Sequence, residues 1–226
     1  MTSSTVVREA RRALGLVGVF LPVPTTSAPP VDLQRDAVRR LERAGYRAAW
    51  TNETVGGKDA LVQLAVLMAA TDRMVFGTGI ANIWARSPQT AHGASALLAQ
   101  AYPGRFVLGL GVGYPQQAAS VGREFGSPVA TMRDYLDRMG APTQLPAPDV
   151  AYPRIIGANG PKMQKFKESA RCAILPGHFQ EGQCQTLKQS RQRSIFYPVR
   201  CISLANRPSS ERFSGPALAL RFGARG

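Results

Sequence analysis

The strongest constraint on the fold of this chain is an alternation of short β-type runs with helical runs between residue 14 and about residue 170. Parallel strands need crossover connections, which are usually helices, so this order predicts a parallel sheet of the α/β type. The spacing predicts strands over residues 14–21, 46–52, 74–83, 106–110 and 154–158, and helices over residues 32–44, 60–70, 88–101 and 129–139 and from residue 161.

Capping residues mark several of the expected helix ends. Asp59 stands directly before a nearly all-apolar run and is expected to be its N-cap. Ser87 and Pro88 place a preferred N-cap residue before a proline, which fits the first helical position. Gly45 follows the first helical run as a C-terminal stop. The sequence therefore gives each of these helices a defined end.

Periodicity alone leaves two folds open, an open doubly wound sheet and a closed barrel. The pattern Gly109-x-Gly111-x-Gly113 favours, at first sight, a dinucleotide-binding fold of the first type. However, the third glycine comes one position early, and Pro115 follows where a helix should open. The dinucleotide-binding fold is therefore the less favoured alternative.

The composition divides the 226-residue chain near residue 160. Residues 1–160 carry 16 Lys and Arg against 11 Asp and Glu, whereas residues 161–226 carry 12 against 3, so most of the net charge of +14 lies in the last part. All three cysteines lie there too, and their spacing matches no metal or redox motif. The strand–helix alternation also fails beyond about residue 171. We therefore expect two parts of different origin.

The N-terminus combines basic residues with an apolar stretch, as a secretory signal does. Arg8, Arg11 and Arg12 precede the apolar residues 13–23, and small residues follow. We favour a short basic leader before a first buried strand, because the apolar stretch continues into the strand–helix order. No apolar run in the sequence approaches the roughly 20 residues that span a bilayer. We therefore expect a cytoplasmic protein that does not enter the membrane.

Four short motifs, three of them containing glycines, follow one another in the first 170 residues. They are residues 50–53 (WTNE), 76–83 (FGTGIANI), 103–113 (PGRFVLGLGVG) and 157–163 (GANGPKM). This ordered series resembles the luciferase-like monooxygenase superfamily, and it is most similar to the branch that uses the deazaflavin coenzyme F-420. The resemblance covers roughly residues 14–170.

The resemblance implies a (β/α)₈ TIM barrel, here an incomplete one of about five strand–helix units, with its site at the carboxyl ends of the strands. It also implies an oxidoreductase or monooxygenase that transfers hydride with F-420, or alternatively FMN, to or from a small-molecule substrate. A homodimer is implied as well. No triad of the Ser-His-Asp kind and no metal-ligand constellation is visible in the sequence.

By the same resemblance, Glu53 at the end of the second strand is the catalytic candidate. Glycines at strand ends let the backbone approach a flat aromatic cofactor, which fits the expected placement. Cofactor contacts are implied for Asn52, Gly79, Ile80, Ala81, Asn82, Gly111, Gly113 and Tyr114.

Each candidate also has a purely structural interpretation. Glu53 is equally well a solvated loop carboxylate, and Asn82 a turn residue. Gly111 and Gly113 fit turn geometry at least as well as a cofactor contact. His92 falls inside an expected helix, where we favour a packing or surface role.

The resemblance stops where the composition changes. A complete barrel of this type needs eight strands and about 250 residues. We therefore expect residues 1–170 to form a partial barrel domain, and residues 171–226 to be an irregular basic tail outside the family, disordered or read in a shifted frame. A barrel truncated in this way is expected to bind its cofactor weakly or not at all, so both an active and an inactive oxidoreductase stay open.

The alternative function is a non-catalytic protein that binds nucleic acid or another acidic surface through the basic tail. The arginines of this part are scattered and few aromatic residues lie between them. Both features disfavour nucleic acid as a partner.

Overall fold

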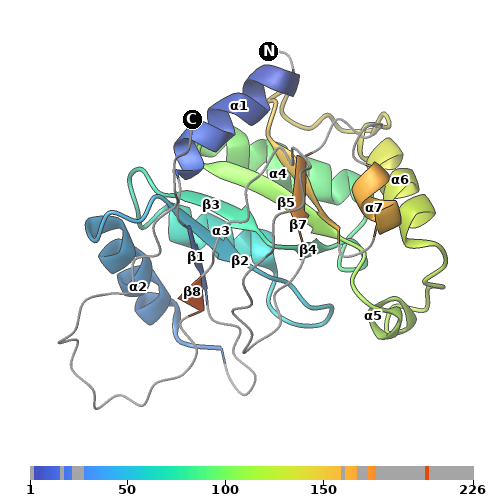
Figure 1. Cartoon of the computed structure of the whole chain (residues 1–226), viewed down its shortest axis with the longest axis horizontal. Helices are drawn as coiled ribbons and strands as arrows, with labels where there is room; N and C mark the ends of the chain where they lie inside the picture. Colours follow the sequence, from blue (N-terminus) through green and yellow to red (C-terminus); the bar gives the residue numbers. More distant parts are fainter. Residues whose placement is uncertain are drawn as a thin grey trace.

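The chain folds around a parallel sheet (Figure 1). The structure, a computed structural model, describes residues 3–15, 18–21, 28–158, 161–166, 173–176 and 202–203. The strands are β1 (Gly18–Phe20), β2 (Ala48–Thr51), β3 (Val75–Thr78), β4 (Ala81–Asn82), β5 (Phe106–Gly111), β6 (Arg154–Ala158), β7 (Ala173–Pro176) and β8 (Ile202–Ser203). They lie in the order β7-β6-β5-β3-β2-β1-β8 with β4 beside β5, and each of these pairs is parallel.

Helices connect the strands and confirm the alternation predicted from the sequence. The helices are α1 (Ser3–Leu14), α2 (Val31–Arg43), α3 (Ala60–Met68), α4 (Pro88–Ala101), α5 (Pro115–Ala119), α6 (Pro128–Met139) and α7 (Pro161–Phe166). The described residues contain five strand–helix units: β1–α2, β2–α3, β3–α4, β5–α6 and β6–α7. Asp59 and Ser87 are N-caps as predicted, and Gly45 after α2 has a positive φ of 87°.

Two helices were missed by the sequence prediction, α1 and α5. We expected a strand to begin at Leu14, but this residue ends α1 and β1 begins only at Gly18. The helical signal was present, because Val7, Ala10 and Leu14 recur at helical spacing and α1 contains neither Gly nor Pro. The single strand predicted over residues 74–83 is also two strands, β3 and β4.

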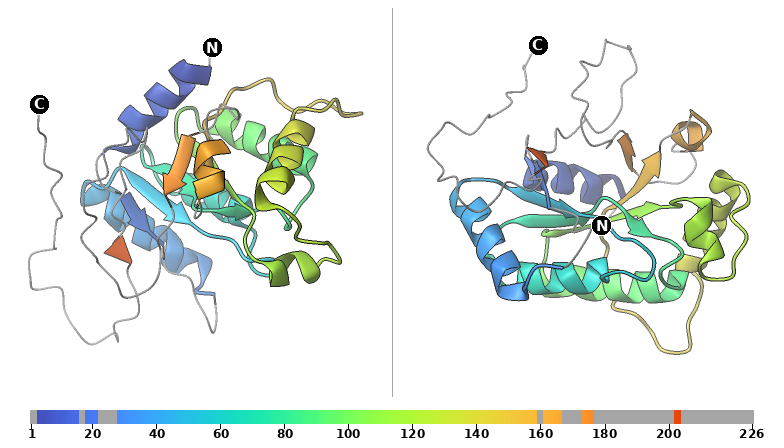
Figure 2. Two further views of the ribbon diagram at one scale, coloured as in Figure 1. Left: turned by 45° about the vertical axis from the view of Figure 1, so that its right-hand side comes forward. Right: turned by 90° about the horizontal axis from the view of Figure 1, so that it is seen from below.

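The larger hydrophobic core lies between the sheet and the helices α2, α3, α4 and α6. The right-hand view of Figure 2 shows α2, α3 and α4 along one face of the sheet. Phe76 from β3, Leu108 from β5 and Ile156 from β6 point into this layer, where they belong to one cluster with Leu64 of α3. Both faces of the sheet are buried, which explains why its strands are nearly continuous apolar runs.

A second hydrophobic cluster covers the opposite, inner face of the sheet. Trp50, Val107 and Ile155 point to this side, and Leu14 at the end of α1 joins them. Figure 2 shows α1 on this face, opposite to α2, α3 and α4. Gly77 in β3 makes room for the indole of Trp50, because a Cβ at this position would overlap the ring. In a closed barrel such inward side chains fill the interior, whereas here α1 packs on them.

Two strands after residue 171 extend the sheet. β7 pairs with β6 at one side, and β8 pairs with β1 at the other. The remainder of the predicted basic tail, residues 171–226, lies outside the described residues. Within the described part of the chain, no helix is both long and apolar enough to cross a membrane.

Candidate functional site

The carboxyl ends of β2, β3 and β5 meet at one edge of the sheet, where β3 forms a bulge. Thr78 Oγ1 donates a hydrogen bond to the carbonyl of Gly109 (2.7 Å) and accepts one from its N–H (2.8 Å). The following peptide bond, between Gly79 and Ile80, is cis. The Gly79 N–H donates to the carbonyl of Thr51 at the end of β2 (2.6 Å). The bulge is therefore bonded to the strands on both sides.

Glycines leave space for the side chain of Ile80 in this bulge. A Cβ on Gly111, the last residue of β5, would lie 2.5 Å from Ile80 Cγ1, and one on Gly157 in β6 would lie 3.1 Å from Ile80 Cγ2. Ordinary side chains at these positions would displace Ile80. The side chain of Ile80 thus lies across the carboxyl ends of β5 and β6.

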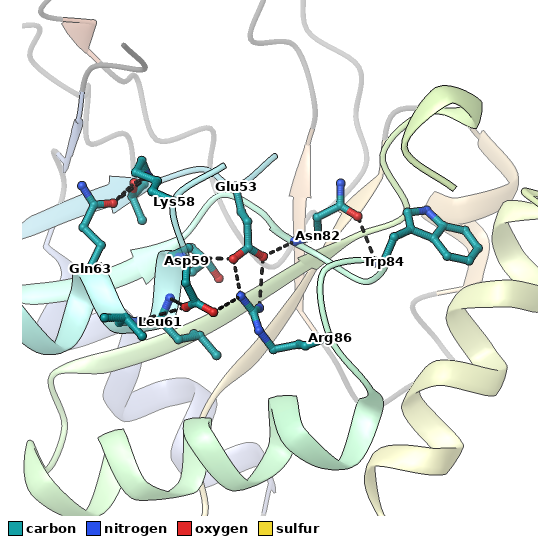
Figure 3. A network of polar contacts seen from close by, with 12 residues as sticks. Glu53, Lys58, Asp59, Leu61, Gln63, Asn82, Trp84 and Arg86 are labelled. Atoms are coloured by element: carbon teal, nitrogen blue, oxygen red, sulfur yellow. Dashed lines mark hydrogen bonds and ion pairs between the residues drawn. The ribbon is translucent and has the colours of Figure 1, made fainter. Parts of the chain in front are cut away.

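The carboxylate of Glu53 lies at the centre of a polar network beside the bulge (Figure 3). Its Oε1 accepts from the N–H of Ala60, the first residue of α3, and its Oε2 from the N–H of Asn82 in β4, both at 2.9 Å. Arg86 binds both oxygens, with Nη1 3.0 Å from Oε2 and Nη2 on Oε1. The side chain of Glu53 is 1% exposed and that of Arg86 is 9% exposed. One buried ion pair therefore joins β2, β4, α3 and the segment before α4.

Arg86 also binds Asp59, the N-cap of α3, with Nη2 2.8 Å from Oδ2. Burial opposes the charge on Arg86, but hydrogen bonds and charge interactions with Glu53 and Asp59 outweigh it and raise the pKa of the guanidinium. Burial likewise opposes ionisation of Asp59, but hydrogen bonds from Val62 and Arg86 outweigh it and lower the pKa of this carboxyl. Asp59 and Arg86 thus keep each other charged.

The side-chain amide of Asn82 has a fixed orientation. Its Oδ1 accepts from the N–H of Trp84 (3.0 Å), whose indole Nε1 donates to the carbonyl of Val112 (2.7 Å). Because the oxygen faces Trp84, the NH₂ group faces away from it. Asn82 is 1% exposed, and its Nδ2 has no hydrogen-bond partner within the described residues. A buried donor without a partner is costly in a folded protein.

The loop after β5 lies next to this amide. Gly113 has a positive φ of 64°, and a Cβ on it would lie 2.8 Å from Asn82 Nδ2. The N–H of the following residue, Tyr114, donates to Gln117 Oε1 in α5 (2.9 Å). The side chain of Tyr114 is largely exposed. The loop thus keeps its backbone close to Asn82 and its aromatic ring in solvent.

Lys58 ties the end of β2 to α3. Its Nζ donates to Thr51 Oγ1 (2.8 Å), to the carbonyl of Asn52 (2.9 Å) and to Gln63 Oε1 (2.6 Å). Burial lowers the pKa of this ammonium, although the nearby carboxylates act in the opposite direction. A hollow of about 140 Å³ lies beside it, lined by the loop after β2, the loop after β4 and Val121.

The structure brings the residues predicted for the site to one edge of the sheet. Asn82 bonds to Glu53, and Gly111 accepts a hydrogen bond from Ile83 (3.1 Å), so the three predicted segments are in contact. Their contact with a cofactor, and the catalytic role of Glu53, stay predictions. Among the described residues, no group of His, Cys, Asp or Glu is placed to hold a metal ion.

Sequence reasoning missed the cationic side of this network. Arg86 and Lys58 were not named, because a lone basic residue in a loop carries no signal of its own. Arg86 lies 33 residues after Glu53, and only the fold brings the two together. Asp59 was predicted as a helix cap but not as an ion-pair partner.

A known protein family matches the part of the chain that forms this arrangement. Residues 16–167, which include β1 to β6 and the network around Glu53, match the luciferase-like monooxygenases. The chain belongs to the luciferase-like monooxygenase family. The resemblance inferred from the glycine motifs is confirmed over nearly the same residues.

Curated relatives of this family member span more sequence than it does. A putative coenzyme F-420-dependent oxidoreductase of Mycobacterium tuberculosis is 34% identical over 111 residues, which are 49% of this chain and 32% of the relative. The 5,10-methylenetetrahydromethanopterin reductase of Methanolobus tindarius is 26% identical over 153 residues, 59% of this chain and 46% of the relative. The chain therefore aligns with a third to a half of these proteins.

Solved structures with low sequence identity to this chain show the same fold. An F-420-dependent secondary alcohol dehydrogenase superimposes with a TM-score of 0.59 at 18% identity, covering 71% of this chain and 57% of the other. The FMN-bound oxygenating component of the 3,6-diketocamphane monooxygenase of Pseudomonas putida gives 0.59 at 17% identity, covering 71% and 56%. The luciferase-like family member thus has the strand–helix order of a TIM barrel, described here over five units.

Proposed function

We propose that the chain is an oxidoreductase of the luciferase-like type, which uses the deazaflavin F-420, or alternatively FMN, for hydride transfer. The match to this family over residues 16–167 is the observation that carries the proposal. An F-420-dependent relative and an FMN-bound structural neighbour support the two cofactors. The cofactor would supply the hydride chemistry, so the protein needs only to bind and orient the ring and the substrate.

The residues at the carboxyl edge of the sheet fit a flat heteroaromatic ring. The unpartnered Nδ2 of Asn82 offers a donor to a ring oxygen or nitrogen. Gly111 and Gly113 bring backbone close to Ile80 and Asn82 without side chains in between. We propose that the cofactor is held by the residues predicted from the sequence, namely Asn52, Gly79, Ile80, Ala81, Asn82, Gly111, Gly113 and Tyr114.

The substrate we propose is a small organic molecule. An alcohol dehydrogenase among the structural neighbours, whose structure holds an F-420-acetone adduct, supports this class. A cytoplasmic location and a homodimer stay predictions from the sequence and from the family resemblance.

The boundary near residue 170 is also part of the proposal. The family match ends at residue 167, and all three cysteines lie after it, where 9 Lys and Arg stand against 3 Asp and Glu, which supports a change of origin there. β7 nevertheless pairs with β6 directly after this boundary. Translation of the other reading frames of the gene tests the proposal, and a frame that continues the barrel after residue 170 is the expected result.

Fluorescence of the deazaflavin provides the functional test. We expect saturable binding of F-420 or FMN to the chain with a dissociation constant weaker than micromolar. In TIM barrels the phosphate commonly binds at the loops after strands seven and eight, which the five matched units do not supply. Gly111→Val should abolish this binding, because its side chain would occupy the space of Ile80. The proposal fails if neither cofactor shows saturable binding at millimolar concentration.

A second candidate function rests on charge alone. Residues 161–226 carry 12 Lys and Arg against 3 Asp and Glu, which favours an acidic partner. Most of these residues lie outside the described part of the chain. Salt-dependent binding of nonspecific DNA, without any effect on F-420 fluorescence, would favour this candidate.

A further inference from the structure

The carboxylate of Glu53 has no capacity left for a reacting group. An ionised carboxylate offers about four acceptor sites, and the four donors of Ala60, Asn82 and Arg86 occupy them. A general acid or base must come within hydrogen-bond reach of the proton that it moves, and this carboxylate is enclosed by its own partners.

Its partners instead connect Glu53 to an unpaired buried donor, the side-chain NH₂ of Asn82. Glu53 Oε2 holds the backbone N–H of Asn82, and Trp84 holds its side-chain Oδ1. The remaining group of Asn82, its NH₂, has no partner within the described residues. The backbone position and the amide orientation of this residue are therefore both set from the protein side.

We propose that Glu53 and Arg86 are positioning residues, which hold β4 so that the side-chain NH₂ of Asn82 donates a hydrogen bond to a carbonyl oxygen of a flavin-type ring. The ligand in this inference rests on the proposed function, whereas the positioning is a property of the free protein. Glu53 acts through Asn82 and moves no proton.

Three substitutions separate the members of this chain of contacts. Asn82→Asp keeps the acceptor for the N–H of Trp84 but removes the NH₂ donor. Glu53→Gln keeps one acceptor oxygen but replaces the other with an NH₂ group. This NH₂ group faces donors, either a backbone N–H or the guanidinium, so hydrogen bonds are lost there. Arg86→Lys is a milder variant, because it keeps the charge but not the bidentate geometry.

The control variant is Glu42→Gln, at the opposite edge of the sheet. Glu42 accepts backbone hydrogen bonds from Asp72, Arg73 and Met74, between α3 and β3. This carboxylate thus also secures a strand through backbone N–H groups. Loss of its contacts should lower the stability of the fold without reaching the candidate site.

The first measurement is hydrogen exchange at the backbone amides of the free protein. We expect Glu53→Gln to speed exchange at Asn82 by about tenfold or more, since a charge-assisted hydrogen bond is lost there. Arg86→Lys should give a smaller increase, and Glu42→Gln no local change at Asn82. Unchanged exchange at Asn82 in Glu53→Gln, or an equal increase in Glu42→Gln, would overturn the positioning role.

The second measurement is F-420 affinity in a double-mutant cycle. We expect Glu53→Gln and Asn82→Asp each to weaken binding by about tenfold, and the double variant to bind no more weakly than Asn82→Asp alone. Additive losses would overturn an action through Asn82, as would an affinity unchanged in Glu53→Gln. Wild-type protein that binds neither F-420 nor FMN would overturn the proposed function and the ligand in this inference, while the exchange data would still decide the positioning role.

Discussion

Gly109 allows the two strands that form the bulge to come together. The hydroxyl of Thr78 bonds to both the N–H and the carbonyl of Gly109. The carbonyl oxygen of Thr78 stands where a Cβ of residue 109 would lie, and the side chain of Ile155 is close by. The atom in the way belongs to the backbone, so a rotation of a side chain cannot relieve the clash. A residue with any side chain here must move β3 or β5.

Gly109→Ala should therefore destabilise the protein by about 3 kcal/mol or more, as overpacking at a rigid site does. Gly93→Ala is the control, because Gly93 lies within α4 and a Cβ on it meets nothing within 4 Å. That change should be neutral or should stabilise by up to about 1 kcal/mol. Urea denaturation measures both free energies of unfolding. Equal midpoints for the two variants would show that the space at Gly109 is not rigid.

At the scale of elements, two carboxylates offset the partial positive charge at the N-terminus of α3. Asp59 accepts from the N–H groups of Leu61 and Val62, and Glu53 accepts from that of Ala60. Both carboxylates meet the partial positive charge of the helix end. Arg86 balances them, and through it α3 is linked to the segment that leads into α4. Helix caps and site geometry are thus built from the same side chains.

This arrangement predicts a pH dependence that belongs to Asp59. The pKa of its carboxyl is lowered in the folded protein, so its contribution to stability is complete above the unfolded value of about 3.9 and is lost as the pH falls through the folded pKa. Asp59→Asn keeps a cap acceptor but not the charge. The wild type should be more stable than this variant by about 0.5–1 kcal/mol at neutral pH, because Asp59 is partly exposed. Urea titrations at pH 7 and near pH 3 should show this difference become smaller on acidification, and a difference that stays constant or grows would contradict it.

At the scale of the whole molecule, the sheet has two cores rather than one. The outer core lies under the helices that connect the strands, and the inner one is covered by α1. Residues 3–14 precede the family match, which begins at residue 16, so α1 lies outside the matched residues. Its Leu14 is 4% exposed, and Val7 and Ala13 pack against the same cluster. α1 thus contributes apolar side chains to the cluster on the inner face of the sheet.

Leu14→Ala should lower the free energy of unfolding by about 2–4 kcal/mol, as other large-to-small changes in a core do. It should also increase the binding of an apolar fluorescent dye, since the inner face becomes more accessible. Leu145→Ala is the matched control, because that leucine is 82% exposed and should change stability by less than about 0.5 kcal/mol. Denaturant titration and dye fluorescence measure the two effects. Equal stability of both variants would mean that α1 does not support the inner core.

Most elements of this protein were predictable because their signals are local. Asp59, Ser87 with Pro88 and Gly45 determine helix ends through contacts with their own neighbours in the chain. Apolar runs such as the one that forms β5 become strands because both of their faces are buried. α1 was missed because its residues were interpreted as a short basic leader before the first strand, and its last residue as the start of that strand. The amphipathic pattern of α1 could nonetheless be recognised in the sequence.

The sequence by itself determined the strand–helix order, the caps and the glycine positions that mark the family, since each depends on a few neighbouring residues or on an ordered motif. Only the tertiary structure decided what those glycines make room for: Trp50 against Gly77, and Ile80 over Gly111. It also decided that Glu53 faces Arg86 and that Asn82 keeps an unpaired NH₂. The members of each pair lie far apart in the chain. Interactions between neighbouring residues therefore do not select one partner over another. The folded sheet brings them together, because its parallel strands end at one edge.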